Sequence, residues 1–215
     1  DTHEPFCIDV AIELDLPVVA IDYRLAPENP FPAAAEDSIA AARWVASGQA
    51  ELRRKPTSLL LAGDSAGGNL AAVVAAALRD DPAAVPVAAQ WLIYPAADPT
   101  VEYPSYHEYC EGHLLTKGSM DWFENSYSGP KGDWRYSPLL AGAAGLPPTF
   151  VVTASLDPIR DQGRAYAARC AEAGVETIYL EAEGTVHGFL NLRKGIPSAQ
   201  EDFERLLQRA KQTKD

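Results

Sequence analysis

A serine lies in a glycine-rich pentapeptide whose pattern could expose it as a nucleophile. Ser65 is the central residue of segment 63–67, GDSAG, which fits G-x-S-x-G. The apolar run 58–62 precedes the segment and an alanine-rich run follows it, which predicts a strand–turn–helix setting. Small flanking residues allow strand and helix to approach while the serine adopts a strained backbone conformation. Its hydroxyl would then lie at a helix N-terminus, where N–H groups can stabilise a developing oxyanion. A tight turn with an incidental serine is the alternative.

Such a serine needs a general base, and the chain holds four histidines. His187 follows the apolar run 177–181 in a glycine-flanked loop, at the C-terminal end of a predicted parallel strand. Catalytic side chains of open α/β sheets gather at that end. His3 lies at the start of the chain, and His107 and His113 lie in a tyrosine-rich stretch that favours a surface role. His187 is therefore the predicted base, with an ordinary loop histidine as the alternative.

The base in turn needs a carboxylate to orient it. Asp157 follows the apolar run 149–154, and the order Ser65, Asp157, His187 is the Ser–Asp–His order of G-x-S-x-G hydrolases. Asp161 lies one helical turn later and favours a charge at a helix N-terminus. Asp98 also ends a predicted strand and could supply the acid instead. Asp157 is the predicted partner of the histidine.

The elements that must position these residues form a strand–helix alternation. Continuous apolar runs fit a parallel sheet covered on both faces. The alternation predicts an α/β fold, a mostly parallel, doubly wound sheet with flanking helices, in a single domain over 1–215. The predicted strands are 16–22, 58–62, 90–94, 149–154 and 177–181. The predicted helices are 4–14, 32–45, 68–78, 159–173 and 199–211.

One long segment interrupts the alternation. Residues 98–148, called the excursion below, are rich in Tyr, Trp, Gly and Pro and hold a predicted helix over 115–127. A connection of this length between neighbouring strands is typical of a lid or a binding segment.

Composition narrows the class of partner. Eighteen Lys and Arg against thirty Asp and Glu give a net charge of −12, which argues against a nucleic-acid partner. No apolar run approaches the roughly 18–20 residues of a membrane span. Cys7, Cys110 and Cys170 are far apart and show neither metal-ligand spacing nor a disulfide framework. A reducing compartment, and hence the cytoplasm, is expected.

Four ordered blocks resemble the hormone-sensitive-lipase-type carboxylesterases, the bacterial family IV group of the α/β-hydrolase superfamily. They run from Tyr23 to Phe189, so the resemblance covers nearly the whole chain. The blocks are YRLAPE at 23–28 with FPAA at 31–34, GDSAGG at 63–68, DPIRD at 157–161 and HGF at 187–189.

The resemblance implies roles for individual residues. Ser65 would be the nucleophile, Asp157 the acid and His187 the base of a serine carboxylesterase acting on short- to medium-chain acyl esters through an acyl-enzyme. Ala66 would donate one N–H to the oxyanion, and no metal or organic cofactor is implied. The block at 23–28 would be a structural turn. The implied substrate-binding residues are Trp122, Phe123, Tyr127 and Phe189, with ordinary core packing as the alternative for those in the excursion.

The sequence departs from the family at its beginning. Family members carry a His-Gly-Gly-Gly loop just upstream of a segment like 1–5, whereas the one Gly-Gly pair here is Gly67-Gly68. The strand leading into that loop would lie between 16–22 and 58–62, so we expect a second polypeptide segment there or an exposed gap. The alternative function is a catalytically impaired scaffold that serves as a binding module. A homodimer through the last strand is also expected.

Overall fold

A parallel sheet forms the centre of the molecule. The computed structural model describes residues 3–52 and 54–211; Asp1 and Thr2, from the segment expected to follow a Gly-rich loop, lie outside the described residues. Within that part of the chain the sheet has four strands in the order β1-β2-β3-β4, all parallel. They are β1 (Leu59–Asp64), β2 (Val87–Ile93), β3 (Thr149–Leu156) and β4 (Thr177–Val186). Four of the five predicted strands are confirmed.

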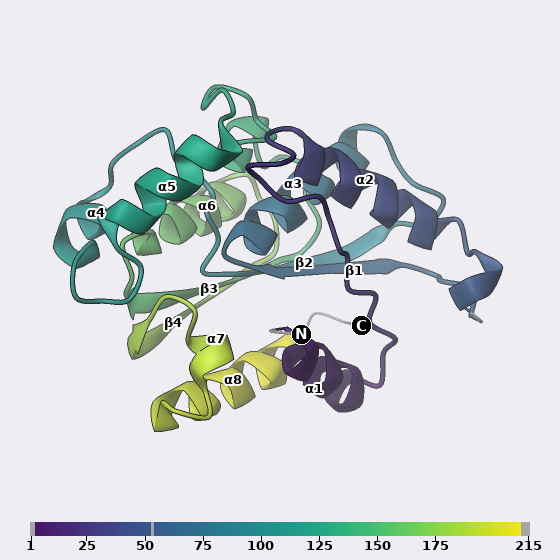
Figure 1. Cartoon of the computed structure of the whole chain (residues 1–215). Coiled ribbons are helices and arrows are strands. Elements are labelled where there is room, and N and C mark those ends of the chain that lie inside the picture. Colours follow the sequence, from purple (N-terminus) through teal and green to yellow (C-terminus); the bar gives the residue numbers. More distant parts are fainter. Residues whose placement is uncertain (1–2, 53, 212–215) are drawn as a thin grey trace.

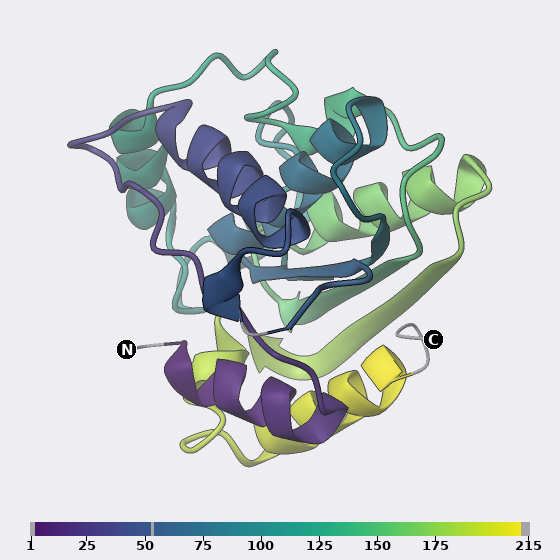
Figure 2. The ribbon, with the colours of Figure 1, turned by 90° about the vertical axis from the view of Figure 1, so that its right-hand side faces the viewer.

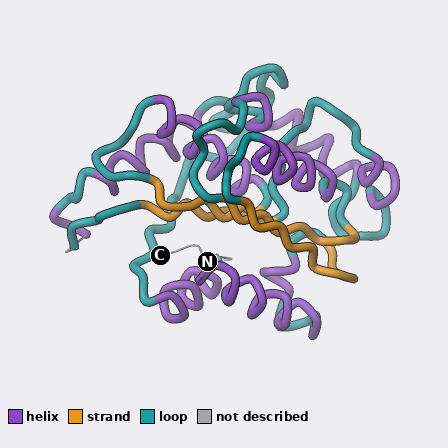
Figure 3. Tube along the Cα trace, turned by 180° about the vertical axis from the view of Figure 1, so that it is seen from behind, coloured by secondary structure: helices purple, strands orange, loops and turns teal. Residues whose placement is uncertain are grey.

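Helices cover both faces of the sheet, which confirms the doubly wound arrangement (Figure 1). One face carries α2 (Ala33–Ala46), α3 (Ala66–Asp80) and α6 (Arg160–Glu172), with α4 (Pro104–Tyr109) and α5 (Lys117–Tyr127) above them. The other face carries α1 (Glu4–Leu14), α7 (Phe189–Leu192) and α8 (Pro197–Ala210). Figure 3 shows the same three layers from behind. Two short 3₁₀ helices, η1 (Ala50–Leu52) and η2 (Pro138–Ala141), lie in connections.

The apolar pattern of the sequence explains these layers. β3 is buried along nearly its whole length, as expected for a central strand with helices on both faces. α8 buries one face, which holds Phe203, Leu206, Leu207 and Ala210, as its spacing predicts. α1 packs against α8 through Phe6 and Phe203, whose ring centroids lie 5.9 Å apart. The layer below the sheet is therefore built from the two ends of the chain.

The predicted strand at 16–22 is wrong. These residues belong to no strand, and Val18, Val19 and Ile21 are exposed. The segment passes from one face of the sheet to the other beside β1 (Figures 1 and 2). A strand needs a hydrogen-bonded neighbour, and no described residue pairs with 16–22 in a ladder. β1 likewise pairs only with β2 among the described residues, and we call its other side the open edge.

The excursion folds into short elements above the sheet. The predicted helix at 115–127 is confirmed as α5, whereas α4 and η2 were not predicted because each is too short for a periodic pattern. Asn69 of α3 donates to the carbonyl oxygens of Ala96 (2.7 Å), just before the excursion, and of Tyr136 (2.9 Å) within it, which ties the excursion to α3. No helix of the described residues is long and apolar enough to cross a membrane.

Candidate active site

A sharp turn between β1 and α3 presents Ser65. Its backbone has φ 56° and ψ −116°, a strained conformation for a residue with a side chain. The two glycines beside the turn are required by close approach. A Cβ on Gly63 would lie 2.1 Å from the Gly67 carbonyl oxygen, and a Cβ on Gly68 would lie 2.9 Å from Cβ of Pro95. The sequence therefore folds here into the strand–turn–helix that its glycine spacing predicts.

Strand register brings the candidate acid and base to the same level of the sheet. Leu156 of β3 pairs with Val186 of β4, so the next residues, Asp157 and His187, leave adjacent strands side by side. Asp64 of β1 pairs with Ile93 of β2 in the same way. Four residues thus follow the C-terminal ends of four parallel strands, and three of them are Ser65, Asp157 and His187.

The three side chains form a continuous hydrogen-bonded line. His187 Nδ1 lies 2.7 Å from Asp157 Oδ2, and His187 Nε2 lies 2.8 Å from Ser65 Oγ. Asp157 is 0% exposed and His187 is 9% exposed. The second carboxylate oxygen of Asp157 accepts from the Ile159 amide at 2.9 Å. A buried carboxylate with both oxygens engaged can hold the imidazole in one tautomer while the other ring nitrogen faces the serine.

Tyr94 completes the ring environment of the histidine and was not predicted. It is the residue that follows β2, and its ring centroid lies 4.7 Å from that of His187. Burial and the nearby Asp64 carboxylate raise the pKa of Tyr94, so its hydroxyl stays protonated and donates to Asp64 Oδ2 at 3.2 Å. Its backbone has φ 36°, in the left-handed region that residues with a side chain seldom adopt, and its side chain is fully buried. Because Tyr94 lies inside the predicted strand 90–94, the sequence pattern indicates an ordinary strand residue and not a residue of the site.

The alternative acids lie in other networks. Asp98 accepts from the Thr100 amide (3.1 Å) and from the Tyr103 hydroxyl (2.7 Å), both within the excursion. Asp161 accepts from the Ser105 amide at 3.0 Å and from Arg160 Nε at 2.9 Å. Neither pairs with a histidine among the described residues.

The other three histidines also contact groups outside the line of Ser65, His187 and Asp157. Nε2 of His3 lies 3.2 Å from Asp64 Oδ1, His107 pairs with Glu102 at 3.5 Å, and Nδ1 of His113 lies 2.8 Å from the Glu111 carbonyl oxygen. His187 is thus the histidine that this structure brings to the serine.

The Ala66 amide stays the predicted oxyanion donor. Ala66 is the first residue of α3, and the first amides of a helix have no intrahelical acceptor. The amide of Ser65 is already used, since it donates to the Ile93 carbonyl at 2.9 Å. Within the described chain no group of three or more His, Cys, Asp or Glu side chains is arranged to hold a metal ion.

The predicted substrate-binding residues lie in three different surroundings. Trp122 and Phe123 on α5 are exposed and contact each other edge-on, with centroids 5.4 Å apart. Tyr127 is half-buried, stacked on Tyr136 and edge-on to Phe31. Phe189 is fully buried and packs edge-on against Tyr94 at 5.4 Å, so its ring lies behind the histidine. Their roles toward a substrate stay predictions.

Comparison with known proteins agrees with this architecture. A model of the alpha/beta hydrolase fold family matches residues 1–191. The chain belongs to the α/β-hydrolase fold family. The family resemblance drawn from the sequence blocks is thereby confirmed.

Curated relatives in this family carry esterase names. The carboxylic ester hydrolase LipN of Mycobacterium tuberculosis is 41% identical over 202 residues, which are 89% of this chain and 54% of LipN. The carboxylesterase NlhH of the same species is 39% identical over 209 residues, 94% of this chain and 65% of NlhH. The chain therefore spans between half and two thirds of the length of these relatives.

Solved structures are similar over almost the whole chain. An esterase from Pyrobaculum calidifontis has a TM-score of 0.91 at 37% identity, covering 98% of this chain and 70% of that one. The ester hydrolase EH1AB1 from the metagenome of Lake Arreo, solved with a bipyridine phosphonate derivative, also has a TM-score of 0.91, at 43% identity. The match covers 97% of this chain and 67% of the EH1AB1 chain.

Proposed function

We propose that the protein is a serine carboxylesterase that works through Ser65, His187 and Asp157. The observation that carries the proposal is the pair of hydrogen bonds on His187, 2.8 Å to the serine hydroxyl and 2.7 Å to the buried carboxylate. The esterase names of its relatives support the same reaction class.

The reaction proceeds through an acyl-enzyme. Ser65 Oγ attacks the ester carbonyl while His187 Nε2 takes the hydroxyl proton, and the alcohol leaves with that proton. A water then attacks the acyl group, again through His187, and the carboxylic acid is released. Asp157 orients the imidazole and stabilises the imidazolium that forms in each half of the reaction. The activity test is the release of 4-nitrophenol from 4-nitrophenyl acetate and hexanoate, with Ser65→Ala as the control.

The oxyanion hole is proposed to need a second polypeptide segment. Ala66 supplies one N–H, and removal of a single donor from such a hole costs about 10²–10³ in kcat. The open edge of β1 and the exposed Val18, Val19 and Ile21 offer a place for an added strand, because both present unpaired backbone or apolar surface. A glycine-rich loop at the end of that strand would bring further N–H donors to Ser65.

The substrate is proposed to be a short- to medium-chain acyl ester. Trp122 and Phe123 would contact the acyl chain, because they are exposed aromatics on a helix of the excursion. Tyr127 and Phe189 would act indirectly. Tyr127 would hold the ring of Tyr136, and Phe189 would hold the ring of Tyr94. A change of preferred acyl length in variants of these residues tests the assignment.

A second candidate function is a binding scaffold with impaired catalysis. The observation that favours it is that, in the described part of the chain, the Ala66 amide is the single donor proposed for the oxyanion. A fluorophosphonate probe separates the two functions, because only an activated serine reacts with it. Labelling of the wild type and not of Ser65→Ala supports the esterase, and equal, slow labelling of both supports the scaffold.

Two further proposals concern assembly and location. A homodimer through β4 is proposed because the outer side of β4 pairs with no strand among the described residues. Light scattering that gives the mass of one chain at micromolar concentration would contradict it. A cytoplasmic location is proposed because Cys7, Cys110 and Cys170 are all unpaired thiols.

A further inference from the structure

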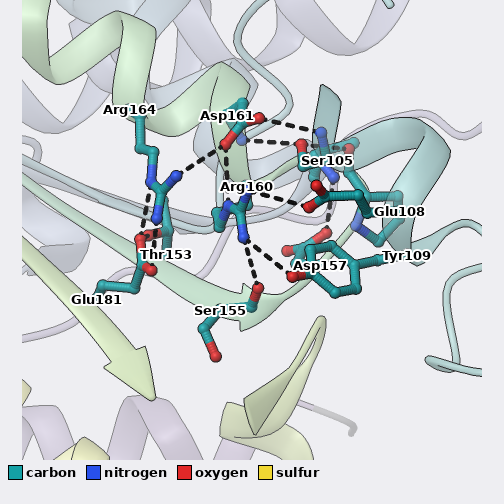
Figure 4. Close-up of polar contacts among 12 residues, drawn as sticks. Ser105, Glu108, Tyr109, Thr153, Ser155, Asp157, Arg160, Asp161, Arg164 and Glu181 are labelled. Atoms are coloured by element: carbon teal, nitrogen blue, oxygen red, sulfur yellow. Dashed lines mark hydrogen bonds and ion pairs between the residues drawn. The ribbon is translucent and has the colours of Figure 1, made fainter. Parts of the chain in front are cut away.

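The backbone that carries Asp157 is held on both sides by side chains. The Ser155 carbonyl oxygen, two residues before Asp157, accepts from Arg160 Nη1 at 3.1 Å. The Pro158 carbonyl oxygen, one residue after Asp157, accepts from Ser105 Oγ at 3.0 Å. Figure 4 shows the side chains of this group lying together beside Asp157. The position of the acid is therefore fixed by more than its own hydrogen bonds.

The second of these contacts comes from the excursion. Ser105 belongs to α4, fifty-three residues from Pro158 in sequence, and is 0% exposed. Its amide donates to Asp161 Oδ2 at 3.0 Å, and its Oγ accepts from the Asp161 amide at 3.2 Å. Three hydrogen bonds thus join one serine of α4 to the turn after β3 and to the first turn of α6.

Arg160 adds partners from the same short helix. Its side chain is 12% exposed, and its Nε donates to Asp161 Oδ1 at 2.9 Å. Its guanidinium lies 5.1 Å from the ring centroid of Tyr109, and its Nη2 lies 3.6 Å from Glu108 Oε2. The Arg160–Asp161 pair is nearly buried, so removal of either partner would leave the other charge desolvated and unpaired.

The end of β3, just before this turn, also contacts the strand that leads to the base. Ser155 Oγ accepts from the Gly184 amide at 2.8 Å, three residues before His187. Arg160 holds the carbonyl of that same Ser155. Movement of the turn would therefore displace the acid and the base together.

Asp161 remains ionised in this setting. Burial opposes its ionisation, but hydrogen bonds from Arg160 and from the Ser105 amide, with the charges of Arg160 and Arg164, outweigh burial and lower the pKa of the Asp161 carboxyl. Arg164 in turn pairs with Glu181 of β4 at 2.7 Å, which closes the network on the sheet (Figure 4).

We propose that Ser105, Arg160 and Asp161 form a clamp through which the excursion positions Asp157 against His187. The three are positioning residues, since none of them touches Ser65 or His187. The inference rests on the proposed function, but the position of Asp157 relative to His187 can be measured without any enzymatic reaction. An error of about 1 Å in the placement of a catalytic group can cost on the order of 10² in rate.

The test compares two variants of the excursion. Ser105→Ala removes the donor to the Pro158 carbonyl, whereas Tyr103→Phe, two residues away, removes a 2.7 Å hydrogen bond to Asp98 that the clamp does not use. We expect Ser105→Ala to lower kcat by about ten- to a hundredfold with little change in KM. The acid limb of its pH–rate profile should move to lower pH, because a displaced carboxylate stabilises the imidazolium less. Tyr103→Phe should change neither quantity.

A spectroscopic signal makes the test independent of activity. The proton that His187 Nδ1 shares with Asp157 should give a low-field ¹H resonance, assigned by its loss in His187→Gln. Ser105→Ala should shift or broaden this resonance, and Tyr103→Phe should leave it in place. If Ser105→Ala does not fold, Asp161→Asn is the second variant. It keeps an oxygen that accepts from the Ser105 amide but removes the charge that pairs with Arg160.

Failure of the inference and failure of the proposed function look different. A wild type that fluorophosphonate does not label would overturn the proposed function. An unmoved resonance in Ser105→Ala and Asp161→Asn, or equal losses of kcat in Ser105→Ala and Tyr103→Phe, would overturn the clamp.

Discussion

At the scale of single residues, the site depends on where four strands end. Ser65, Tyr94, Asp157 and His187 are each the first residue after a strand, and the strand register sets their relative heights. The hydrogen bonds then select the chemistry, because the imidazole lies between a hydroxyl and a buried carboxylate. A shift in the register of these strands by one residue would separate the side chains of Ser65, Asp157 and His187.

The first prediction concerns Ser65 and His187. Ser65→Ala and His187→Ala should each lower kcat/KM for an aryl ester by about 10³-fold or more, and the double variant should be no worse, because the triad acts as a unit. Steady-state kinetics on a matched 4-nitrophenyl ester measures this. His113→Ala, whose ring contacts the Glu111 carbonyl in the excursion, is the control and should keep full activity. Retention of more than a few per cent of activity in Ser65→Ala would contradict the assignment.

The second prediction concerns acid stability. The folded-state pKa of Asp161 is lowered, so the stability it contributes is fully present above the unfolded value of about 3.9 and is lost as pH falls through the folded value. The difference in unfolding free energy between the wild type and Asp161→Asn should therefore be constant from pH 7 to pH 5 and shrink in more acid solution. Urea unfolding at several pH values measures it. A difference that grows on acidification would show that the ionised carboxylate is not what stabilises the turn.

At the scale of elements, the turn between β1 and α3 is the most constrained feature. The third prediction is that Gly63→Ala unfolds or severely destabilises the protein, by about 3 kcal/mol or more, because its Cβ would meet the backbone of Gly67. Gly118→Ala on α5 is the matched control, since a Cβ there meets only Thr116 Oγ1 at 4.0 Å. Denaturant unfolding should place the control at or above wild-type stability. Equal stability of the two variants would refute the close approach.

The fourth prediction separates two aromatics of the excursion. Trp122 is 58% exposed, so Trp122→Ala should shift acyl-chain preference with little loss of stability. Tyr127 packs on Phe31 and Tyr136, so Tyr127→Ala should lower the unfolding free energy by roughly 2 kcal/mol. The ratio of activities on acetate and hexanoate esters, measured beside thermal unfolding, distinguishes them. Equal proportional losses on both esters in Trp122→Ala would make that residue structural.

The sequence predicted well those helices and strands that depend on the residues of their own segment. The α/β class, four strands and the helices at 4–14 and 159–173 follow from apolar runs and their punctuation by glycine and proline. The segment at 16–22 has the composition of a strand but no pairing partner among the described residues, so its apolar residues stay exposed. Composition predicts the tendency to form a strand, whereas a ladder requires a neighbour.

The same distinction holds for the site. Ser65, Asp157 and His187 could be predicted because a short pattern, a strand end and a chain order identify them. Tyr94, Ser105 and Arg160 could not, because their roles come from contacts across the fold, such as the fifty-three residues between Ser105 and Pro158. Such residues carry no spacing signal in one sequence.

At the scale of the whole molecule, the two ends of the sheet differ. β4, the edge proposed for the homodimer, carries charged side chains, including Glu181 paired to Arg164, which limit the strands that can pair with it. The open edge of β1 faces an exposed apolar segment instead. This asymmetry supports the proposal that an added strand binds at β1 and completes the oxyanion hole.

The central claim is that Ser65 is a nucleophile activated by His187 and Asp157. Its most direct test is to react the protein with a fluorophosphonate and locate the adduct by peptide mass spectrometry. The account predicts one adduct, on Ser65, formed at least about 10²-fold more slowly in His187→Ala and absent in Ser65→Ala. An adduct on another residue, or labelling of Ser65 that is unchanged by His187→Ala, would contradict it.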